Sequence, residues 1–320
     1  MPEPRDPRRE AFDRLDGRYE VRVLEPSPPA IQTPGLIEDQ VERGDVPEGR
    51  QVVGPVATAD VTWAELAAGD EELAEWCRAR WLADWPRLGA VPEEFAATRD
   101  ALHLIAEHVL SPTRARDLGE ITLRWTRGGF GTPFFGSDSQ LRIEADQLVV
   151  QRGDEVTSAP ITTLGDVAEF VGFELTRFED LSYQPLAVDP VASTYLGEVF
   201  GFAFSVLEQL RADAGLLEPS FVNLWPEHFD VAVEIGSEKL GQRAAYGVSP
   251  GDSDHAEPYL YVAPWTARPD GALWRARGFD GAQMSWSELI GAEDQRVAAL
   301  EFFSRRLDEL VPGRPKGDGR

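Results

Sequence analysis

Two short segments of the sequence combine imidazole and carboxylate side chains. They run from 226 to 230 and from 252 to 258, and they hold His228 and His255, two of the four histidines. His228 and Asp230 stand two apart in a predicted strand, so both side chains leave it on the side opposite Phe229 and Val231. An imidazole beside a carboxylate is held in one tautomer, which suits general-base chemistry or metal binding.

The same segments supply nitrogen and oxygen ligands for a divalent metal. His255 and Glu257 lie in or beside a loop that leads into a predicted strand over 258–262. If this strand lies near 228–235, His228 and His255 become metal ligands, and Asp230 and Glu257 become catalytic carboxylates. The alternative is a hydrated acidic turn, because the spacing matches neither an EF-hand loop nor a zinc signature.

A predicted helix carries the other two histidines, His103 and His108. Its apolar residues recur three and four apart from Phe95 to Val109, which predicts one buried stripe. Five helical steps turn His103 and His108 about 140° apart, so one metal cannot bind both. We therefore expect His103 to face the space between two halves of the protein as a catalytic residue, and His108 to lie at the boundary of the core.

Three further residues are predicted to bind a ligand. Arg124 and Arg127 flank a glycine-rich run at 128–131, and together they offer guanidinium groups and backbone amides to an anion. The run lacks the lysine and the helix of a phosphate loop, so a flexible hairpin connection is the alternative. The third is Tyr261, which lies in the predicted strand over 258–262.

Composition limits the partners and the compartment. The formal net charge is −25 over 320 residues, and such a surface repels nucleic acids and anionic membranes. Cys77 is the only cysteine, which excludes an internal disulfide and favours a reducing cytoplasm. The first residues lack the apolar core of a signal peptide, and no apolar run of about 18 residues is evident. A small molecule is the expected partner.

The pattern of elements predicts an α+β fold. Residues 1–58 form a proline-rich arm or irregular lead-in with one edge strand near 19–24, and residues 59–175 contain helices followed by an antiparallel meander and a helix from Thr163. Residues 190–312 begin with a helix over 194–214 and end with a helix over 293–311 that buries Val297. Between them we predict strands at 220–225, 228–235, 243–248, 258–264, 272–278 and 282–286. The tail 313–320 is expected to be disordered. The fold is therefore two helix-then-antiparallel-sheet halves packed together.

Short motifs between about residues 100 and 310 resemble an uncharacterised bacterial family named domain of unknown function 5996. They are 101–103 leading to 119–123, 223–225 with 229–233, and 257–258 before an aromatic strand. The resemblance implies a shared fold but brings no established activity. His103, Asp230 and Glu257 fall on the matching positions, whereas His228 and His255 depart from the pattern, which puts a metal site built on both in doubt.

Three functions follow from these features. The first is small-molecule binding with acid–base catalysis in a His/Asp/Glu pocket between the halves. The second is a protein-interaction module without catalysis, in which residues 1–58 dock a partner. The third is a hydrolase or isomerase that depends on a divalent metal, while any other cofactor stays unknown.

Overall fold

The computed structural model describes residues 19–23, 50–55, 87–126, 129–133, 135, 139–152, 155–175, 182–214, 217, 219–266 and 269–314. Within the predicted arm, β1 (Tyr19–Val23) pairs antiparallel with β2 (Arg50–Pro55), which confirms the strand near 19–24. Cys77, Arg127 and residues 315–320 of the tail lie outside the described residues, as does the rest of the arm.

The first half is a helical segment followed by a five-stranded antiparallel sheet. Its helices are α4 (Phe95–Ile105), the π-helix η1 (Ala106–Leu110), α5 (Ser111–Leu118) and α6 (Leu164–Val171). The strands are β3 (Arg124–Thr126), β4 (Gly129–Gly131), β5 (Ser139–Glu144), β6 (Gln147–Arg152) and β7 (Glu155–Pro160), and each pairs with the next. The predicted meander is confirmed, and so is the helix that Thr163 caps by accepting the amide of Asp166.

The glycine-rich run does not form the flexible connection that its composition suggested. Gly129–Gly131 is itself the strand β4, paired with β3 on one side and β5 on the other. A Cβ atom on Gly129 would lie 2.0 Å from the carbonyl oxygen of Ile143, so only glycine fits against β5 here. The run is a structural strand inside the sheet.

The second half follows the predicted plan of helix, sheet and helix. It contains α8 (Pro190–Ala214), β8 (Asn223–Trp225), β9 (Asp230–Ile235), the short η2 (Glu238–Leu240), β10 (Ala244–Ser249), β11 (Tyr259–Pro264), β12 (Ala282–Ser285), α9 (Trp286–Gly291) and α10 (Gln295–Leu310). The antiparallel order is β12-β11-β10-β9-β8. No strand forms at 272–278, and Val297 is 50% exposed, so these two predictions are wrong.

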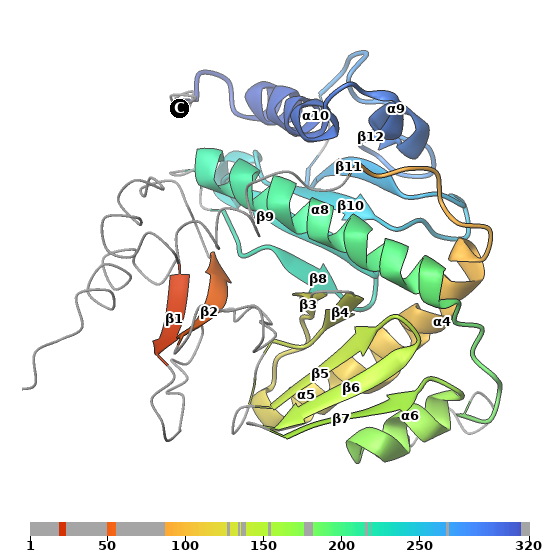
Figure 1. Cartoon of the computed structure of the whole chain (residues 1–320). Coiled ribbons are helices and arrows are strands. Elements are labelled where there is room, and N and C mark those ends of the chain that lie inside the picture. The colour runs from red at the N-terminus through yellow and green to blue at the C-terminus, as the bar shows by residue number, and fades with distance from the viewer. Residues whose placement is uncertain are drawn as a thin grey trace, which may run out of the picture.

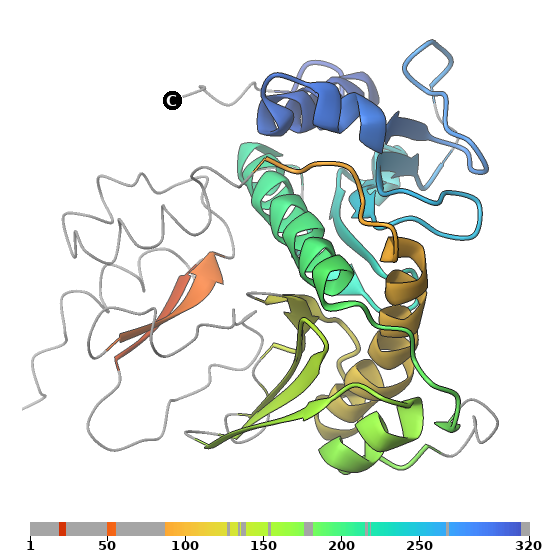
Figure 2. The ribbon, with the colours of Figure 1, turned by 45° about the vertical axis from the view of Figure 1, so that its right-hand side comes forward.

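Helix α8 joins the two halves. Asp189 caps it by accepting the amide of Ala192, and Pro190 occupies its first turn, where its missing N–H costs nothing. It contacts both sheets as well as α4 and α10, and Figures 1 and 2 both place it with the first sheet on one side and α10 on the other. The buried apolar residues form one continuous core across both halves.

The length and composition of α8 would also suit a membrane span. Residues Pro190–Arg211 are long and apolar enough for such a span, so the expectation that no apolar run of about 18 residues exists is wrong. Because 78% of the apolar window is buried inside the fold, packing between the sheets accounts for its composition. The helix is thus weak support for a membrane segment.

The two faces of the second sheet differ. Alternate residues such as Val231, Val233, Tyr246 and Val248 point toward α8 and α10 and are fully buried. The opposite face carries no helix of the described chain over its centre, and it forms the floor of a cavity. A mutual backbone pair between Leu123 and Leu224, at 2.8 and 2.9 Å, ties the first half to the edge of this sheet.

Candidate functional site

A cavity of about 1000 Å³ lies over the outer face of the second sheet. Its floor is made of outward-facing residues of three strands, namely Asp230, Ala232 and Glu234 of β9, Ala245 and Ser249 of β10, and Tyr259, Tyr261 and Ala263 of β11. The β8–β9 turn and the loops at 250–258 and 277–279 supply further walls. Among the described residues of the first half, His103 and Ile121 alone line the cavity. The pocket expected between the halves is therefore built mainly by the second one.

Asp230 is buried in the floor of this cavity. Its side chain is 5% exposed, and its Oδ2 accepts a short hydrogen bond from the hydroxyl of Tyr261. Burial raises the pKa of Asp230 to about 6, while the Tyr261 bond and the nearby His228 lower it in part. Its other oxygen, Oδ1, has no hydrogen-bond partner among the described residues. One acceptor of this buried carboxyl is thus left unsatisfied by the described residues.

A glycine allows Tyr261 to reach Asp230. Gly247 of β10 pairs with Tyr261 of β11 on one side and with Ala232 of β9 on the other. The Tyr261 ring therefore crosses β10 at a position that has no side chain. A Cβ atom on Gly247 would lie 2.4 Å from Cζ of Tyr261 and 2.5 Å from its hydroxyl oxygen. Burial and the charge of Asp230 raise the pKa of Tyr261, so the phenol remains a donor.

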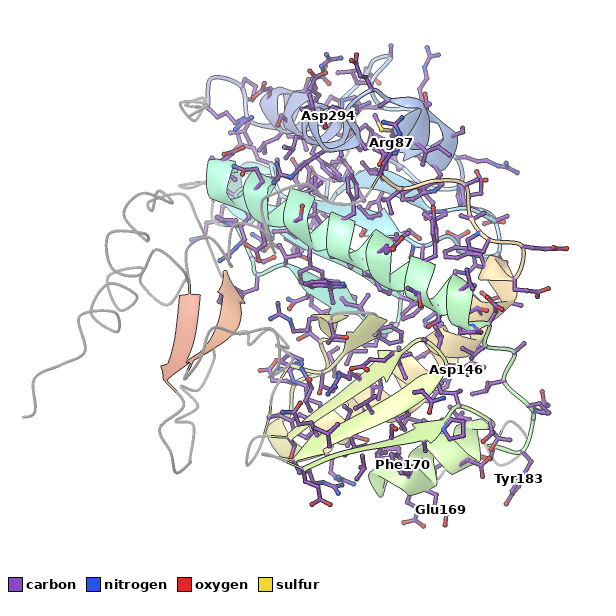
Figure 3. All side chains as sticks on the ribbon, in the orientation of Figure 1. Arg87, Asp146, Glu169, Phe170, Tyr183 and Asp294 are labelled. Carbon is purple, nitrogen blue, oxygen red and sulfur yellow. The ribbon has the colours of Figure 1, made fainter. Side chains whose placement is uncertain are left out.

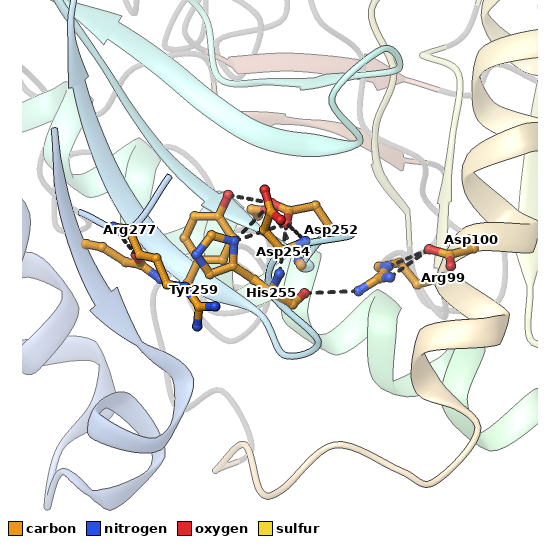
Figure 4. Close-up of polar contacts among 10 residues, drawn as sticks. Arg99, Asp100, Asp252, Asp254, His255, Tyr259 and Arg277 are labelled. Atoms are coloured by element: carbon orange, nitrogen blue, oxygen red, sulfur yellow. Dashed lines mark hydrogen bonds and ion pairs between the residues drawn. The ribbon is translucent and has the colours of Figure 1, made fainter. Parts of the chain in front are cut away.

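A second carboxylate, Asp252, orients His255 (Figure 4). The imidazole Nδ1 lies 3.0 Å from Oδ1 of Asp252, and because a carboxylate only accepts, Nδ1 carries the proton. The hydroxyl of Tyr259 donates to Oδ2 of Asp252 at 2.9 Å. Burial alone would raise the pKa of Asp252, but these bonds and the backbone amide of Asp254 lower it below its ordinary value. His255 Nε2 has no partner among the described residues, so it is available as an acceptor.

The backbone of the loop that carries His255 is held by the tight packing of Gly251 and by Arg99 of α4. Gly251 adopts a φ of +98°, and a Cβ atom there would lie 2.6 Å from the carbonyl oxygen of His255 and 2.7 Å from the guanidinium of Arg99. Arg99 projects from α4, donates to Asp100 at 2.7 Å and approaches the His255 carbonyl at 3.4 Å. The first half therefore helps to position a residue of the second.

His103 lines the cavity as predicted, and its imidazole also contacts two residues of the β8–β9 turn. Its Nε2 donates to the carbonyl of Pro226 at 2.9 Å, and its ring stacks on Phe229 with centroids 5.0 Å apart. Phe229 is buried against Phe130 and Phe200 and has a φ of +53°, which is strained for a bulky residue. This conformation sends Phe229 into the core while Asp230, the next residue, faces the cavity.

The predicted metal site is not assembled. His228 lies in the β8–β9 turn and is exposed, rather than in a strand, although it lines the cavity together with His255. Nowhere in the described ranges do three or more His, Cys, Asp or Glu side chains gather as metal ligands. The turn explains the error, because the strand begins only at Asp230 and the two-residue alternation does not extend back to His228.

The helix between His103 and His108 is not regular. It becomes a π-helix over Ala106–Leu110, where the amide of Ser111 bonds to the carbonyl of Ala106 just before Pro112, which has no N–H. Both imidazoles have Nε2 3.8 Å from the same oxygen of Glu107. The angular separation expected from an α-helix therefore does not describe this pair, although only His103 lines the cavity.

Two other predicted site residues lie elsewhere. Glu257 is exposed and does not line the cavity, because the loop turns its side chain away before β11 begins. Arg124 is 5% exposed under α8, where its guanidinium lies 5.6 Å from the ring of Phe204, so it belongs to the core rather than to a ligand site. Of the predicted ligand-binding residues that the structure describes, Tyr261 lines the cavity and Arg124 does not.

Carboxylates outnumber cationic side chains around the cavity. Glu227, Asp230, Glu234, Asp252 and Asp254 line it, whereas Arg277 is the only arginine or lysine of the described residues in the lining. Glu234 is neutralised by a bond of 2.8 Å to Arg243. The remaining surface of the cavity favours positive charge in a bound molecule.

Sequence reasoning missed three parts of this site. Asp252 stands three residues before His255, a spacing at which a loop carboxylate can cap and hold an imidazole. Tyr259 shares the face of Tyr261, as strand alternation requires. Gly247, placed within an apolar strand, is the usual mark of a close approach by another group.

The chain was also compared with known proteins. No family model matches it, and neither a curated protein nor a solved structure gives a significant match.

Proposed function

We propose that the cavity over the second sheet binds a small organic molecule and exchanges protons with it through Asp230 and His255. The observation that carries this proposal is the carboxyl of Asp230, which is buried, bonded by Tyr261 at one oxygen and without a described partner at the other. An unpaired buried acceptor lowers stability, and a ligand that donates to it removes that penalty.

The two groups have complementary states. Asp230, with a pKa of about 6, exists in both protonation forms close to neutral pH, as a general acid or base requires. His255 is held by Asp252 in the tautomer whose free Nε2 accepts a proton. In the proposed reaction, His255 Nε2 takes a proton from the bound molecule, and the Asp230 carboxyl returns one to it when protonated.

Two further expectations belong to this proposal. We propose a cytoplasmic protein with a small-molecule partner, and a fold shared with the resembling family. The alternative, partner capture through residues 1–58, concerns a segment that lies largely outside the described residues and stays a prediction.

A fragment screen tests the proposal. Thermal shifts with a library of small acids, amines and alcohols would be measured for the wild type, Asp230→Asn and Glu169→Gln, each against its own ligand-free Tm. Glu169 is an exposed carboxylate on α6 that points away from the fold (Figure 3), so its variant is the control for the loss of one charge. We expect hits that raise the Tm of the wild type and the control alike but not of Asp230→Asn. Hits that act equally on all three proteins would place binding outside the cavity.

A further inference from the structure

We propose that the ligand of this cavity is an organic cation with several N–H donors, a primary ammonium or a guanidinium, whose charged head binds between Asp230 and His255. This inference rests on the proposed function and specifies its ligand. It starts from two buried atoms, Asp230 Oδ1 and His255 Nε2, that lack a partner among the described residues and belong to residues lining one cavity.

Both of these atoms are acceptors. Asp230 Oδ1 accepts whenever the carboxyl is ionised, and the Tyr261 hydroxyl already occupies Oδ2. His255 Nε2 accepts because Nδ1 holds the proton that is donated to Asp252. Two unpartnered acceptors on residues that line one cavity are matched by a ligand with at least two donors. An ammonium or guanidinium head supplies three or more, whereas an alcohol supplies one and a carboxylate none.

The charge of the lining favours the same head. Four carboxylates of the lining lack an arginine or lysine partner in the described chain, namely Glu227, Asp230, Asp252 and Asp254. A cation bound beside the ionised form of Asp230 would compensate the charge whose burial is otherwise unfavourable. An anion would meet these carboxylates, and only Arg277 opposes them.

Three aromatic residues of the cavity lining pack against one another. The centroids of Tyr259, Tyr261 and Phe279 lie between 6.2 and 6.5 Å from one another, and all three residues line the cavity. Aromatic faces attract cations and also pack on an apolar body. A cation with an apolar or aromatic body therefore suits both parts of the site.

A series of four molecules with one phenylethyl-type body tests the head group. The probes are phenethylamine, its N,N,N-trimethyl ammonium analogue, 2-phenylethanol and phenylacetate, titrated into the full chain by calorimetry, with agmatine as a guanidinium probe. We expect phenethylamine to bind about tenfold or more tightly than 2-phenylethanol, and phenylacetate not to bind. The trimethyl analogue keeps the charge but has no N–H, so it is expected to bind more weakly than the amine.

Variants connect the preference to the two acceptors. Asp230→Asn should weaken binding of phenethylamine about tenfold or more, and Glu169→Gln should leave it within about twofold. Asp252→Asn, which releases the Nδ1 proton of His255, should weaken it to a smaller extent. These changes in the stated direction support the proposal.

The outcomes separate this inference from the proposed function. Tighter binding of phenylacetate, of the alcohol or of the trimethyl analogue, lost in Asp230→Asn, would overturn the N–H cation and leave a small-molecule site intact. Failure of phenethylamine and agmatine to bind at millimolar concentration would also overturn it, whereas fragment hits that ignore Asp230→Asn would overturn the proposed function itself.

Discussion

Asp230 and Asp252 line the same cavity, and each accepts a hydrogen bond from a tyrosine, yet their pKa values move in opposite directions. Asp230 is almost fully buried and has one described donor, so burial dominates and raises its pKa to about 6. Asp252 lies at the rim and accepts from His255, Tyr259 and two backbone amides, and its pKa falls. The extent of burial and the number of donors that compensate it together decide the sign.

This difference assigns separate roles to two similar side chains. Two titratable groups whose environments push their pKa values apart are suited to different steps of one reaction. Asp230 can carry a proton near neutral pH, while Asp252 stays ionised and holds the His255 imidazole in one orientation. Each prediction below changes one member of this pair or its support.

The largest expected effect is a gain in stability from Asp230→Asn at alkaline pH. The pKa of Asp230 is raised from 3.8 to about 6, so the folded protein loses stability as rising pH ionises this group. At about 1.4 kcal/mol per pKa unit, the loss reaches up to about 3 kcal/mol at pH 8. Asparagine removes the charge, so the free energy of unfolding in urea should rise by about 1–3 kcal/mol at pH 8 and hardly change at pH 4.

Glu169→Gln serves as the control, because it removes an exposed carboxylate and should change stability by less than about 0.5 kcal/mol at either pH. A loss of stability in Asp230→Asn at pH 8 would mean that the ionised carboxylate is favoured in the fold. The contrast with Asp252 would then be lost. A gain would identify Asp230 as a group that the fold keeps at the expense of stability, as binding sites commonly do.

The next effect concerns the support of Asp230. In Gly247→Ala the new Cβ would lie 2.4 Å from the Tyr261 ring, so the ring must leave its position over β10. We expect a loss of about 1–3 kcal/mol in the free energy of unfolding. The pKa of Asp230 should also rise above about 6, because the Tyr261 bond that lowers it is lost. Urea unfolding and carbon NMR of the Asp230 carboxyl measure the two effects.

Gly291→Ala is the matched control, since a Cβ atom there has nothing within 4 Å. It should be neutral or slightly stabilising at the end of α9. Equal behaviour of the two glycine variants would show that Tyr261 does not depend on the gap at Gly247.

Regular alternation explains what the sequence could predict about this site. Asp230 faces away from Val231 and Val233, and Tyr261 shares its face with Tyr259, because strand residues two apart point the same way. Apolar residues recur every three or four positions along α8 and α10. This spacing, sustained over several turns, predicted both helices with little ambiguity. The α+β fold class follows from these elements and is confirmed.

Irregular backbone explains what the sequence could not predict. Whether Asp252 or Glu257 enters the cavity depends on the φ of Gly251 and on the hydrogen bonds of one loop, and a loop has no period. Strand β4 is only three residues long and glycine-rich, so its pairing with β3 and β5 leaves no alternation to detect. His228 was misplaced because the turn ends at Phe229, with φ +53°, two residues later than the pattern suggested.

The smallest expected effect on stability belongs to Asp252→Asn. The pKa of Asp252 is lowered, so its contribution to stability is present above pH 3.8 and is lost as pH falls through its folded pKa. The side chain is 42% exposed, so solvent screening limits the loss to about 0.5 kcal/mol near neutral pH. The free energy of unfolding in urea, compared between pH 7 and a pH below 3.8, measures it.

The same variant should have a clear effect on His255. An asparagine amide can donate as well as accept, so it no longer fixes the proton on Nδ1, and nitrogen NMR should detect a population with the proton on Nε2. Asp254→Asn is the control, because it removes a charge from the same loop while Asp254 bonds to Asp252 only through its backbone amide. An unchanged tautomer in Asp252→Asn would separate the orientation of His255 from the carboxylate. The imidazole would then have to be held by its 4.4 Å contact with the Tyr259 ring, and the division of roles between the two aspartates would no longer apply.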